Sequence, residues 1–249
     1  MCRHVAYLGP PVVLASVLLD PPHSLLRQSW APKDMRRGGT LNADGYGFGW
    51  YPDGETDAAR YRRGCPMWTD GNLRTVAAAI VSHAFLGAVR NATVGMPVME
   101  TAAAPFVDGP WLFSHNGAVE GWPDAVVKVA ERLATRDLLT LDAPTDAALL
   151  WAVVRERLRS GVPMVDAVAD TVAEVERAAP GSRLNLLLTD GAQIVATTAG
   201  HALSVWCADG RVLVSSEPLD DDGRWEPVPE GKLVIATPAA VDITDWGRT

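Results

Sequence analysis

The sequence is poor in cysteine and has no apolar stretch of membrane-spanning length. Its three cysteines stand at positions 2, 65 and 207. So small and odd a set does not form a disulfide framework, and it is typical of a reducing compartment. The longest apolar stretches, Val12 to Leu19 and Ala147 to Val154, are eight residues each, whereas a membrane-spanning helix needs roughly 18 or more. We therefore expect a cytoplasmic protein that stays out of the membrane.

Positive charge is also scarce. The chain carries 22 basic against 30 acidic side chains, so its formal net charge is −8, and its pI is near 5.1. This balance argues against nucleic acid or an anionic membrane as the main partner. Apolar sequence is plentiful: 48% of the 249 residues are hydrophobic, which is enough for one full-sized core. Because there is no repeat, linker or break in composition, residues 2–249 are predicted to form a single domain.

The order of hydrophobic patterns predicts a layered α+β fold. A strand over residues 2–8 is followed by Pro10 and Pro11, which we interpret as the first turn of a helix ending at Leu19, because proline is tolerated there. Further strands are expected over residues 46–51, 59–62, 80–86 and 111–114, and helices over residues 73–79, 122–134, 145–159 and 163–178. The closing strands, over residues 184–188, 194–198, 203–207, 212–215 and 233–236, suggest a meander.

Cys2 is the first candidate for chemistry. Initiator methionine is normally removed before a small residue, so Cys2 would become the N-terminus. A thiol with a reference pKa of about 8.5 and an α-amine of about 7.7–8.0 would then share one residue. The neutral amine can take the thiol proton, directly or through a water. Judged by its position alone, the simpler alternative to a catalytic role is that Cys2 is a small apolar residue at the start of a strand. His4 adds only one metal-type ligand, which is too few for a zinc site.

Asn116 and Gly117 are candidates for stabilising an oxyanion. An Asn side-chain amide and the next backbone N–H can donate to a tetrahedral intermediate, where one lost donor costs about 2.7–4 kcal/mol. The alternative is a plain Asn-Gly turn, in which His115, Asn116 and Gly117 simply stop the strand that ends at Ser114.

Two further candidates carry opposite charges. Arg90 can grip a carboxylate through two parallel hydrogen bonds, with Thr93 adding a third; a surface arginine in a loop is the alternative. Asp146 can face an ammonium group, unless Thr145 or Asp146 is only a helix N-cap. A thiol, an amine, two donors, one cation and one anion together describe a pocket for a zwitterionic glutamyl group with its γ-carbonyl over sulfur.

The order of these motifs resembles the class II glutamine amidotransferase domain. The matching features are Cys2, Asp44-Gly45, the R-x-A-T-x-G segment from Arg90, the H-N-G segment from His115 and the Thr145-Asp146 pair. This family belongs to the N-terminal nucleophile hydrolases, so the resemblance implies a four-layer αββα sandwich. It covers most of the chain.

The resemblance also implies a role for each matched residue. It makes Cys2 the nucleophile, with its own α-amine as the base, and it implies neither a metal nor another cofactor. Residues 42–45 would form the loop beside the nucleophile. The remaining site residues are then Asn116 and Gly117 for the oxyanion, Arg90 and Thr93 for the substrate α-carboxylate, Asp146 for the α-ammonium and His115 for a further substrate contact.

The sequence also departs from the family pattern. Asn91 and Val94 stand where Trp and His are usual, and Ala147 and Ala148 follow the acidic residue in place of a hydroxyl residue and Glu. We therefore expect the leaving-group side to differ from that of a standard glutaminase. No synthase sequence follows the domain. This favours simple hydrolysis, as in the stand-alone γ-glutamyl amidohydrolases that the chain resembles.

Tryptophan is unusually frequent, with nine Trp against four Phe and four Tyr. Aromatic side chains can cage a quaternary ammonium group, such as a trimethylammonium on the leaving group; core filling is the alternative. The tryptophans near candidate loops are Trp30, Trp50, Trp68, Trp111 and Trp122. Arg36 and Arg37 are candidates for a second substrate carboxylate, although a solvated loop explains them equally simply.

Two other functions stay open. One is a glutaminase subunit that passes ammonia to a partner synthase. The other is an inactive relative that serves as a binding module. Whether the chain is a γ-glutamyl amidohydrolase or a glutaminase subunit, the substrate is a small γ-glutamyl molecule. The oligomeric state does not follow from the sequence.

Overall fold

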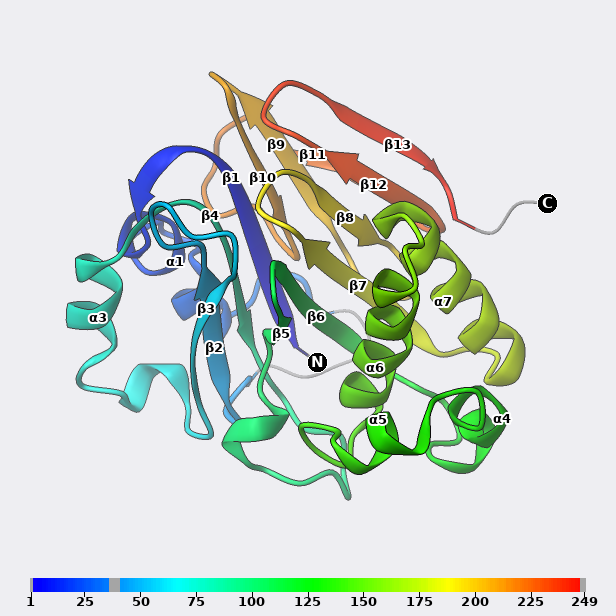
Figure 1. Ribbon diagram of the computed structural model, residues 1–249. Helices are drawn as coiled ribbons and strands as arrows, with labels where there is room; N and C mark the ends of the chain where they lie inside the picture. Colours follow the sequence, from blue (N-terminus) through cyan, green and yellow to red (C-terminus); the bar gives the residue numbers. More distant parts are fainter. Residues whose placement is uncertain (1, 36–40, 247–249) are drawn as a thin grey trace.

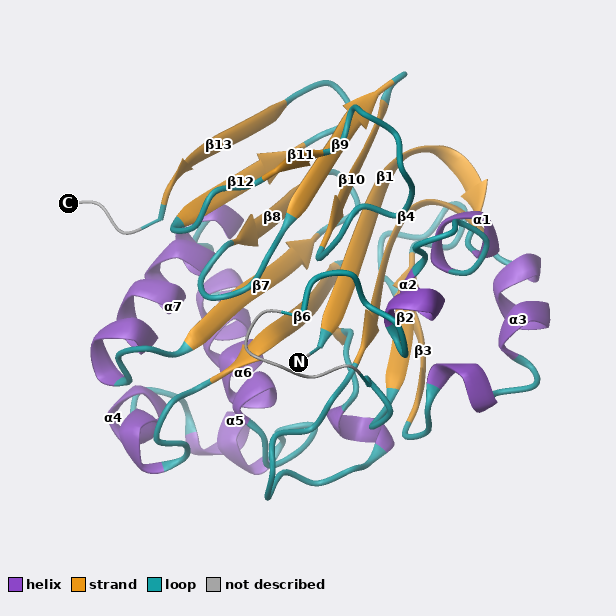
Figure 2. Ribbon diagram, turned by 180° about the vertical axis from the view of Figure 1, so that it is seen from behind, coloured by secondary structure: helices purple, strands orange, loops and turns teal. Residues whose placement is uncertain are grey.

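The computed structural model describes residues 2–35 and 41–246. In this part of the chain two antiparallel sheets lie face to face, and helices cover the outer face of each (Figures 1 and 2). No helix in these two ranges is long and apolar enough to cross a lipid bilayer.

The first sheet has the strand order β11-β9-β10-β1-β4-β2-β3. Its strands are β1 (Arg3–Val13), β2 (Tyr46–Trp50), β3 (Ala59–Arg63), β4 (Val81–Val89), β9 (Ser204–Ala208), β10 (Arg211–Ser215) and β11 (Glu226–Pro227). β1 is central, because Val5 lies opposite Gly87 of β4 on one side and opposite Ser215 of β10 on the other. The start of the chain is therefore held between partners from its middle and from near its end.

The second sheet has the order β13-β12-β8-β7-β6-β5. Its strands are β5 (Phe106–Asp108), β6 (Trp111–Ala118), β7 (Arg183–Thr189), β8 (Ile194–Thr197), β12 (Lys232–Ala236) and β13 (Val241–Asp245). Strands β6 and β7 pair along their length, with His115 opposite Leu186 and Asn116 opposite Asn185.

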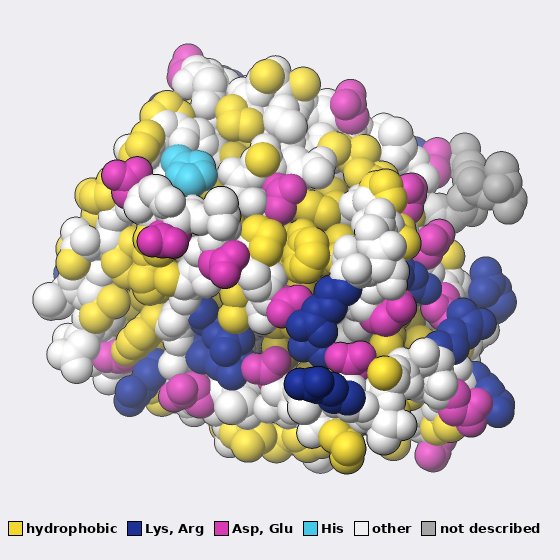
Figure 3. All heavy atoms as spheres, viewed as in Figure 1, with side chains coloured by type: hydrophobic (Ala, Val, Ile, Leu, Met, Phe, Trp, Pro, Cys, Tyr) yellow, Lys and Arg dark blue, Asp and Glu magenta, His cyan; other side chains and the backbone are white. Residues whose placement is uncertain are grey.

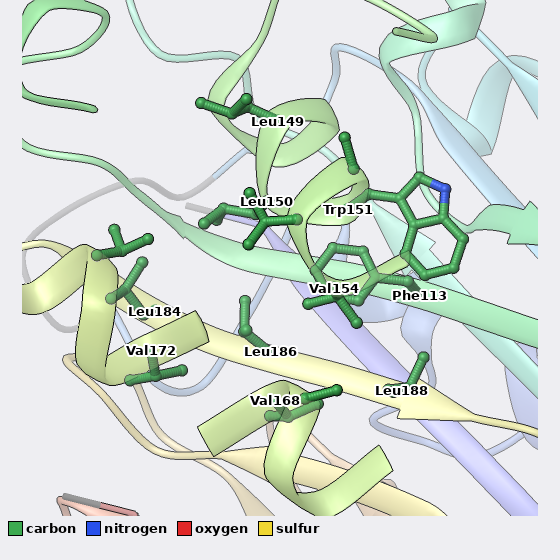
Figure 4. Packing of buried hydrophobic residues seen from close by; sticks show 14 of the residues in the cluster. Phe113, Leu149, Leu150, Trp151, Val154, Val168, Val172, Leu184, Leu186 and Leu188 are labelled. Carbon is green, nitrogen blue, oxygen red and sulfur yellow. The ribbon is translucent and has the colours of Figure 1, made fainter. Parts of the chain in front are cut away.

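Two long helices cover the second sheet. The elements outside the sheets are α1 (Ala15–Leu18), α2 (Leu25–Gln28), α3 (Leu73–Ala79), α4 (Val127–Ala130), α5 (Thr135–Leu139), α6 (Asp146–Arg159) and α7 (Met164–Ala178), with 3₁₀ turns η1 (Met67–Thr69), η2 (Glu100–Ala102) and η3 (Asp124–Val126). Trp151 of α6 stacks on Phe113 of β6 with ring centroids 5.4 Å apart. Figure 4 shows Val168 and Val172 of α7 over the same sheet.

Alternation along the strands produces three apolar interfaces. Phe113 packs under α6 and α7, whereas its neighbour Leu112 lies in the cluster between the two sheets. Ala6 of β1 joins that middle cluster, and Val5 faces α1 and α2 on the opposite side. Successive side chains of a strand point to opposite faces, so each sheet buries both of its faces. The predicted four-layer αββα sandwich of the N-terminal nucleophile hydrolase type is confirmed.

The predicted helix from Pro10 is wrong. Pro10 and Pro11 lie in β1, and the pairing of β1 with β4 shifts register between Leu8 and Val12. On the other side, β10 follows β1 only as far as Leu8. The prolines therefore sit where that ladder has ended and no backbone N–H is required from them. The helix that follows is only Ala15–Leu18.

The predicted stop at His115-Asn116-Gly117 is also wrong. β6 runs through all three residues to Ala118, with Gly117 opposite Leu184 of β7. A Cβ at Gly117 would lie 1.8 Å from the carbonyl oxygen of Arg183. This glycine therefore marks a close approach of two strands and not a turn.

Other elements match in part. Helices α6 and α7 confirm the predictions over 145–159 and 163–178, and the strands expected over 46–51 and 59–62 are present as β2 and β3, which pair with each other. The helix expected over 122–134 is broken into η3 and the short α4. The closing strands do not form one meander, because β7, β8 and β12 belong to the second sheet and β9 and β10 to the first.

The charged surface is mixed. Figure 3 shows Lys and Arg side chains on the lower part of one face with Asp and Glu among them. Ion pairs in the described ranges include Arg62–Asp142 at 2.9 Å and Arg155–Asp137 at 3.1 Å. These guanidinium groups are therefore already paired with carboxylates of the chain itself.

Candidate functional site

A pocket of about 480 Å³, including its open mouth, lies beside the start of β1. Its wall combines the residue before β1, the loop after β4, part of β6 and the N-terminus of α6. The predicted site residues that line it are Cys2, Arg90, Thr93, His115, Gly117 and Asp146. Residues far apart in the sequence thus meet around one cavity, as the motif order predicts.

Cys2 immediately precedes the central strand. Its Sγ is 3.8 Å from the carbonyl oxygen of Asn91, within hydrogen-bond distance for sulfur, and the residue is half-buried. Its own carbonyl oxygen accepts a 2.9 Å hydrogen bond from Nη1 of Arg3. Met1 lies outside the described residues.

Arg3 forms a buried ion pair with Glu217, which the sequence does not reveal. Arg3 Nε lies 2.6 Å from Glu217 Oε1, and the side chains are only 2% and 3% exposed. Arg3 Nη2 also donates to the carbonyl of Asp34, and Glu217 Oε2 accepts the N–H of Lys33 at 2.7 Å. The pair therefore ties the segment beside Cys2 to the 33–34 loop. An arginine at the start of a mostly apolar strand is the one available signal.

Arg90 lies at the end of β4, held by backbone groups. Its N–H donates to Gly45 O at 2.8 Å, and its Nη1 donates to Pro97 O at 2.8 Å. Asp44 completes this arrangement by accepting the N–H of Ala92 at 2.8 Å through Oδ2. Within the described ranges no ion pair joins Arg90 to a carboxylate, so the guanidinium keeps donors with which to bind an anion.

Asp146 is the first residue of α6, after the N-cap Thr145, whose hydroxyl accepts the N–H of Ala148 at 3.3 Å. The Asp146 carboxylate accepts N–H groups from Ala147 at 2.8 Å and from Val119 at 3.0 Å. It is buried yet lines the pocket. Thr145 is thus the cap, and the carboxylate has further lone pairs with which to receive an ammonium group.

His115 is oriented by the strand beside it. Its Nε2 lies 2.8 Å from the carbonyl oxygen of Arg183. A carbonyl only accepts, so Nε2 carries the proton and Nδ1 is left as an acceptor.

Asn116 differs from its neighbours, because its side chain is on the opposite face of β6 from His115 and does not line the pocket. It is 1% exposed, and its Nδ2 lies 3.5 Å from Ser216 Oγ. It lines a smaller hollow together with Arg3 and His201. The predicted oxyanion pair is thus divided, with Gly117 at the pocket and Asn116 behind it.

Two histidines near the site are buried and neutral at pH 7. Burial, followed by the neighbouring imidazole of His115, lowers the pKa of His4 to about 3. Burial, followed by the charge of Arg183, lowers the pKa of His201 to about 3. His4 Nδ1 lies 3.2 Å from Ser114 Oγ. The part of the chain that the structure describes contains no group of three or more His, Cys, Asp or Glu side chains able to hold a metal ion.

The tryptophans expected near the leaving group do not line this pocket in the described part of the chain. Trp111 and Trp122 pack against the core under α6 and α7, and Trp30 meets Trp68 edge to face at 5.9 Å. Core filling is therefore the better interpretation for Trp111 and Trp122, whereas Trp68 is 40% exposed. Arg36 and Arg37 lie outside the described residues.

A four-layer αββα sandwich with a cysteine directly before a central strand defines an N-terminal nucleophile hydrolase fold. A sequence model of the class II glutamine amidotransferases matches residues 27–209, and the chain belongs to this family. The family acts on amide bonds. A protein from Silicibacter pomeroyi described as a glutamine aminotransferase class-II domain protein is similar in structure, with a TM-score of 0.69, 24% identity and 99% of each chain covered.

The chain is also similar to curated proteins over nearly its whole length. It is 41% identical to the gamma-glutamyl-hercynylcysteine sulfoxide hydrolase of Mycolicibacterium smegmatis, covering 98% of this chain and 99% of that protein. The hydrolase of the same name from Mycobacterium tuberculosis is also 41% identical, covering 100% of this chain and 98% of that protein. These names agree with the γ-glutamyl hydrolase that the sequence predicts.

Proposed function

We propose that this chain is an amidohydrolase that cleaves γ-glutamyl-hercynylcysteine sulfoxide into glutamate and hercynylcysteine sulfoxide, a step of ergothioneine biosynthesis. The observation that carries the proposal is the pocket in which a thiol, a guanidinium and a buried carboxylate converge, from Cys2, Arg90 and Asp146. The names of the 41% identical relatives supply the substrate. The enzyme would act as one domain, residues 2–249, in the cytoplasm.

Cys2 would act once Met1 is removed. Its free α-amine takes the thiol proton, and Sγ attacks the γ-carbonyl carbon to form a tetrahedral oxyanion. The intermediate collapses as the C–N bond breaks, and the amine product leaves with the proton. Water then attacks the thioester with the same amine as base, which releases glutamate and restores the thiol. Neither a metal nor another cofactor takes part in these steps.

Oppositely charged side chains would hold the glutamyl group. Arg90 binds the α-carboxylate, with Thr93 beside it, because its guanidinium has donors left over from its carbonyl contacts. Asp146 binds the α-ammonium through the lone pairs that Val119 and Ala147 leave free. His115 adds its Nδ1 acceptor. A butyryl amide, which lacks both the α-carboxylate and the α-ammonium, would lose both ionic contacts and bind more weakly.

Oxyanion stabilisation would come from Gly117 and Asn116. Gly117 contributes its backbone N–H at the pocket wall, and Asn116 contributes Nδ2 from the strand face behind it. Asn91 and Ala147 also line the pocket. Because they replace larger residues of the family pattern, we propose that they widen the leaving-group side for a substituted amine.

A substrate panel tests the proposal. The untagged protein, checked by intact mass for loss of Met1, is incubated with γ-glutamyl-hercynylcysteine sulfoxide or with glutamine, and glutamate release is measured. We expect the conjugate to be hydrolysed, free glutamine to be a poor substrate, and Cys2→Ala to abolish turnover while leaving substrate binding. The matched control is Cys207→Ala, at an exposed cysteine outside the pocket, and it should remain active.

Three results would replace the proposal. Rapid hydrolysis of glutamine that rises with a partner protein would identify a glutaminase subunit. Full activity of Cys2→Ala would remove Cys2 as the nucleophile. A Cys2→Ala variant that still performs the cellular role would point to a binding module.

A further inference from the structure

Ser216 lies directly after β10 and two hydrogen bonds fix it to the strand of the nucleophile. Its N–H donates to His4 O at 2.9 Å, and the N–H of His4 donates to Ser216 Oγ at 3.0 Å. The residue is 2% exposed. Its hydroxyl oxygen is therefore held in one place, two residues along β1 from Cys2.

The hydrogen bonds around this hydroxyl are incomplete as they stand. Its oxygen accepts from His4 N–H and, at 3.5 Å, from Nδ2 of Asn116. No acceptor for the hydroxyl proton of Ser216 is found in residues 2–35 and 41–246. In the same contact, Oδ1 of Asn116 is buried and has no partner among the described residues. A buried polar group without a partner costs about 1–3 kcal/mol.

One rotation gives both of these groups a partner and leaves the Nδ2 donors of Asn116 as the unpaired ones. The oxygen and nitrogen of an Asn amide have nearly the same shape and exchange places when the amide turns by half a revolution. Oδ1 then faces Ser216, accepts its hydroxyl proton and gains a partner. Nδ2 moves to the place that Oδ1 has left. No group in the described ranges contacts an atom there by a hydrogen bond, so the Nδ2 donors remain available.

We propose that Ser216 is a positioning residue that locks the Asn116 amide with Nδ2 free to donate to the oxyanion formed on Cys2. This inference rests on the proposed function, since it assigns Asn116 to the oxyanion. It explains why Asn116 lies behind the pocket against β10, where a serine hydroxyl and not solvent sets its orientation.

Ser215 provides a natural control. It is the preceding residue, it is fully buried, and its Oγ has no hydrogen-bond partner in the described structure. Neighbouring residues of a strand point to opposite faces, so its hydroxyl is directed away from Asn116. Removing it alters burial and composition next to the site without touching the proposed contact.

The test compares Ser216→Thr with Ser216→Val, which have nearly the same shape and differ in the hydroxyl. We expect Ser216→Thr to keep most of the wild-type kcat and Ser216→Val to lose about 10- to 100-fold, with little change in KM, because a misoriented donor is felt mainly in the transition state. Ser215→Ala should match the wild type. Thermal unfolding of each variant checks that the protein is folded at the temperature of the activity assay.

A double-mutant cycle separates positioning from general disturbance. Asn116→Ala alone should lower kcat by about 100- to 1000-fold, and adding Ser216→Val to it should cause no further loss. Equal kcat for the Val and Thr variants, or losses that multiply in the double variant, would overturn the role of Ser216. If those results come with an inactive Cys2→Ala protein, the proposed hydrolase survives; an active Cys2→Ala protein overturns the hydrolase itself.

Discussion

Gly117 stands at a position of the fold that has no room for a side chain. It lies in β6 opposite Leu184, and an added Cβ would meet the Arg183 carbonyl at 1.8 Å and His115 Nε2 at 2.5 Å. Neither neighbour can move freely, because His115 Nε2 is itself bonded to that carbonyl. The same backbone therefore serves the sheet and the pocket wall.

Gly117→Ala should consequently destabilise the fold and remove activity. The clash forces β6 away from β7, and we expect a loss of roughly 3 kcal/mol or more in the free energy of unfolding, as for other overpacked or strained buried sites. Gly223→Ala is the matched control, because no heavy atom lies within 4 Å of its added Cβ. Urea unfolding and glutamate release measure both variants; an active, stable Gly117→Ala protein would contradict the geometry.

The sequence predicts individual site residues well where charge and position are distinctive. Cys2, Arg90 and Asp146 line one pocket as expected, although their roles stay predictions. The sequence does not predict a role that depends on a residue far away along the chain. Glu217 is 214 residues from Arg3, and nothing in the local sequence of either residue shows that the two carry one buried ion pair.

At the scale of an element, β1 is held by more than its two neighbouring strands. The Arg3–Glu217 pair fixes its first residue to the segment after β10 and, through Lys33 and Asp34, to the loop after α2. Both charges are almost fully buried, so each depends on the other for compensation.

Glu217→Gln should therefore be costly. It leaves Arg3 buried without a counter-charge, and we expect a loss of about 3–5 kcal/mol in the free energy of unfolding. Glu131→Gln breaks an exposed pair with Lys128, whose side chains are 55% and 86% exposed, and should cost about 0–1 kcal/mol. Chemical denaturation gives both numbers. Similar small losses at the two sites would show that the buried pair does not stabilise the fold.

Elements with local signals are predicted and elements defined by distant pairing are not. Helices α6 and α7 follow from their apolar spacing and begin within one residue of the expected positions. Pro10 and Pro11 mimic a helix start, and only the short reach of β10 shows why a strand tolerates them. The division of the closing strands between two sheets depends on pairing with β1 and β6, which no local pattern specifies.

For the whole molecule, two buried histidines couple folding to pH. The pKa of His4 and that of His201 are both lowered to about 3 in the folded chain, mainly by burial, with positive charge from Arg3 near both and from Arg183 near His201. In the unfolded chain each would bind a proton near pH 6.5. The unfolded state thus holds more protons between about pH 6.5 and 3, so stability falls as pH falls through this window.

We expect each histidine to add up to about 1.4 kcal/mol of lost stability per pH unit below 6.5, and nothing above it. The measurement is the free energy of unfolding in urea at pH 7, 6 and 5. A His4→Gln, His201→Gln variant should show a shallower slope, by close to two protons between pH 6 and 5, whatever its stability at pH 7. The same slope in both proteins would contradict the assignment.

Because β1 lies between β4 and β10, it gains its second neighbouring strand only late in synthesis of the chain. Its partner β10 ends at Ser215, beyond residues 27–209 that define the family match. A ribosome adds about 5–20 residues per second, so Cys2 waits roughly 10–40 s before both flanking strands exist. Residue 2 is therefore among the last parts of this sequence to gain its final surroundings, and a chain cut after residue 209 would leave one side of β1 unpaired.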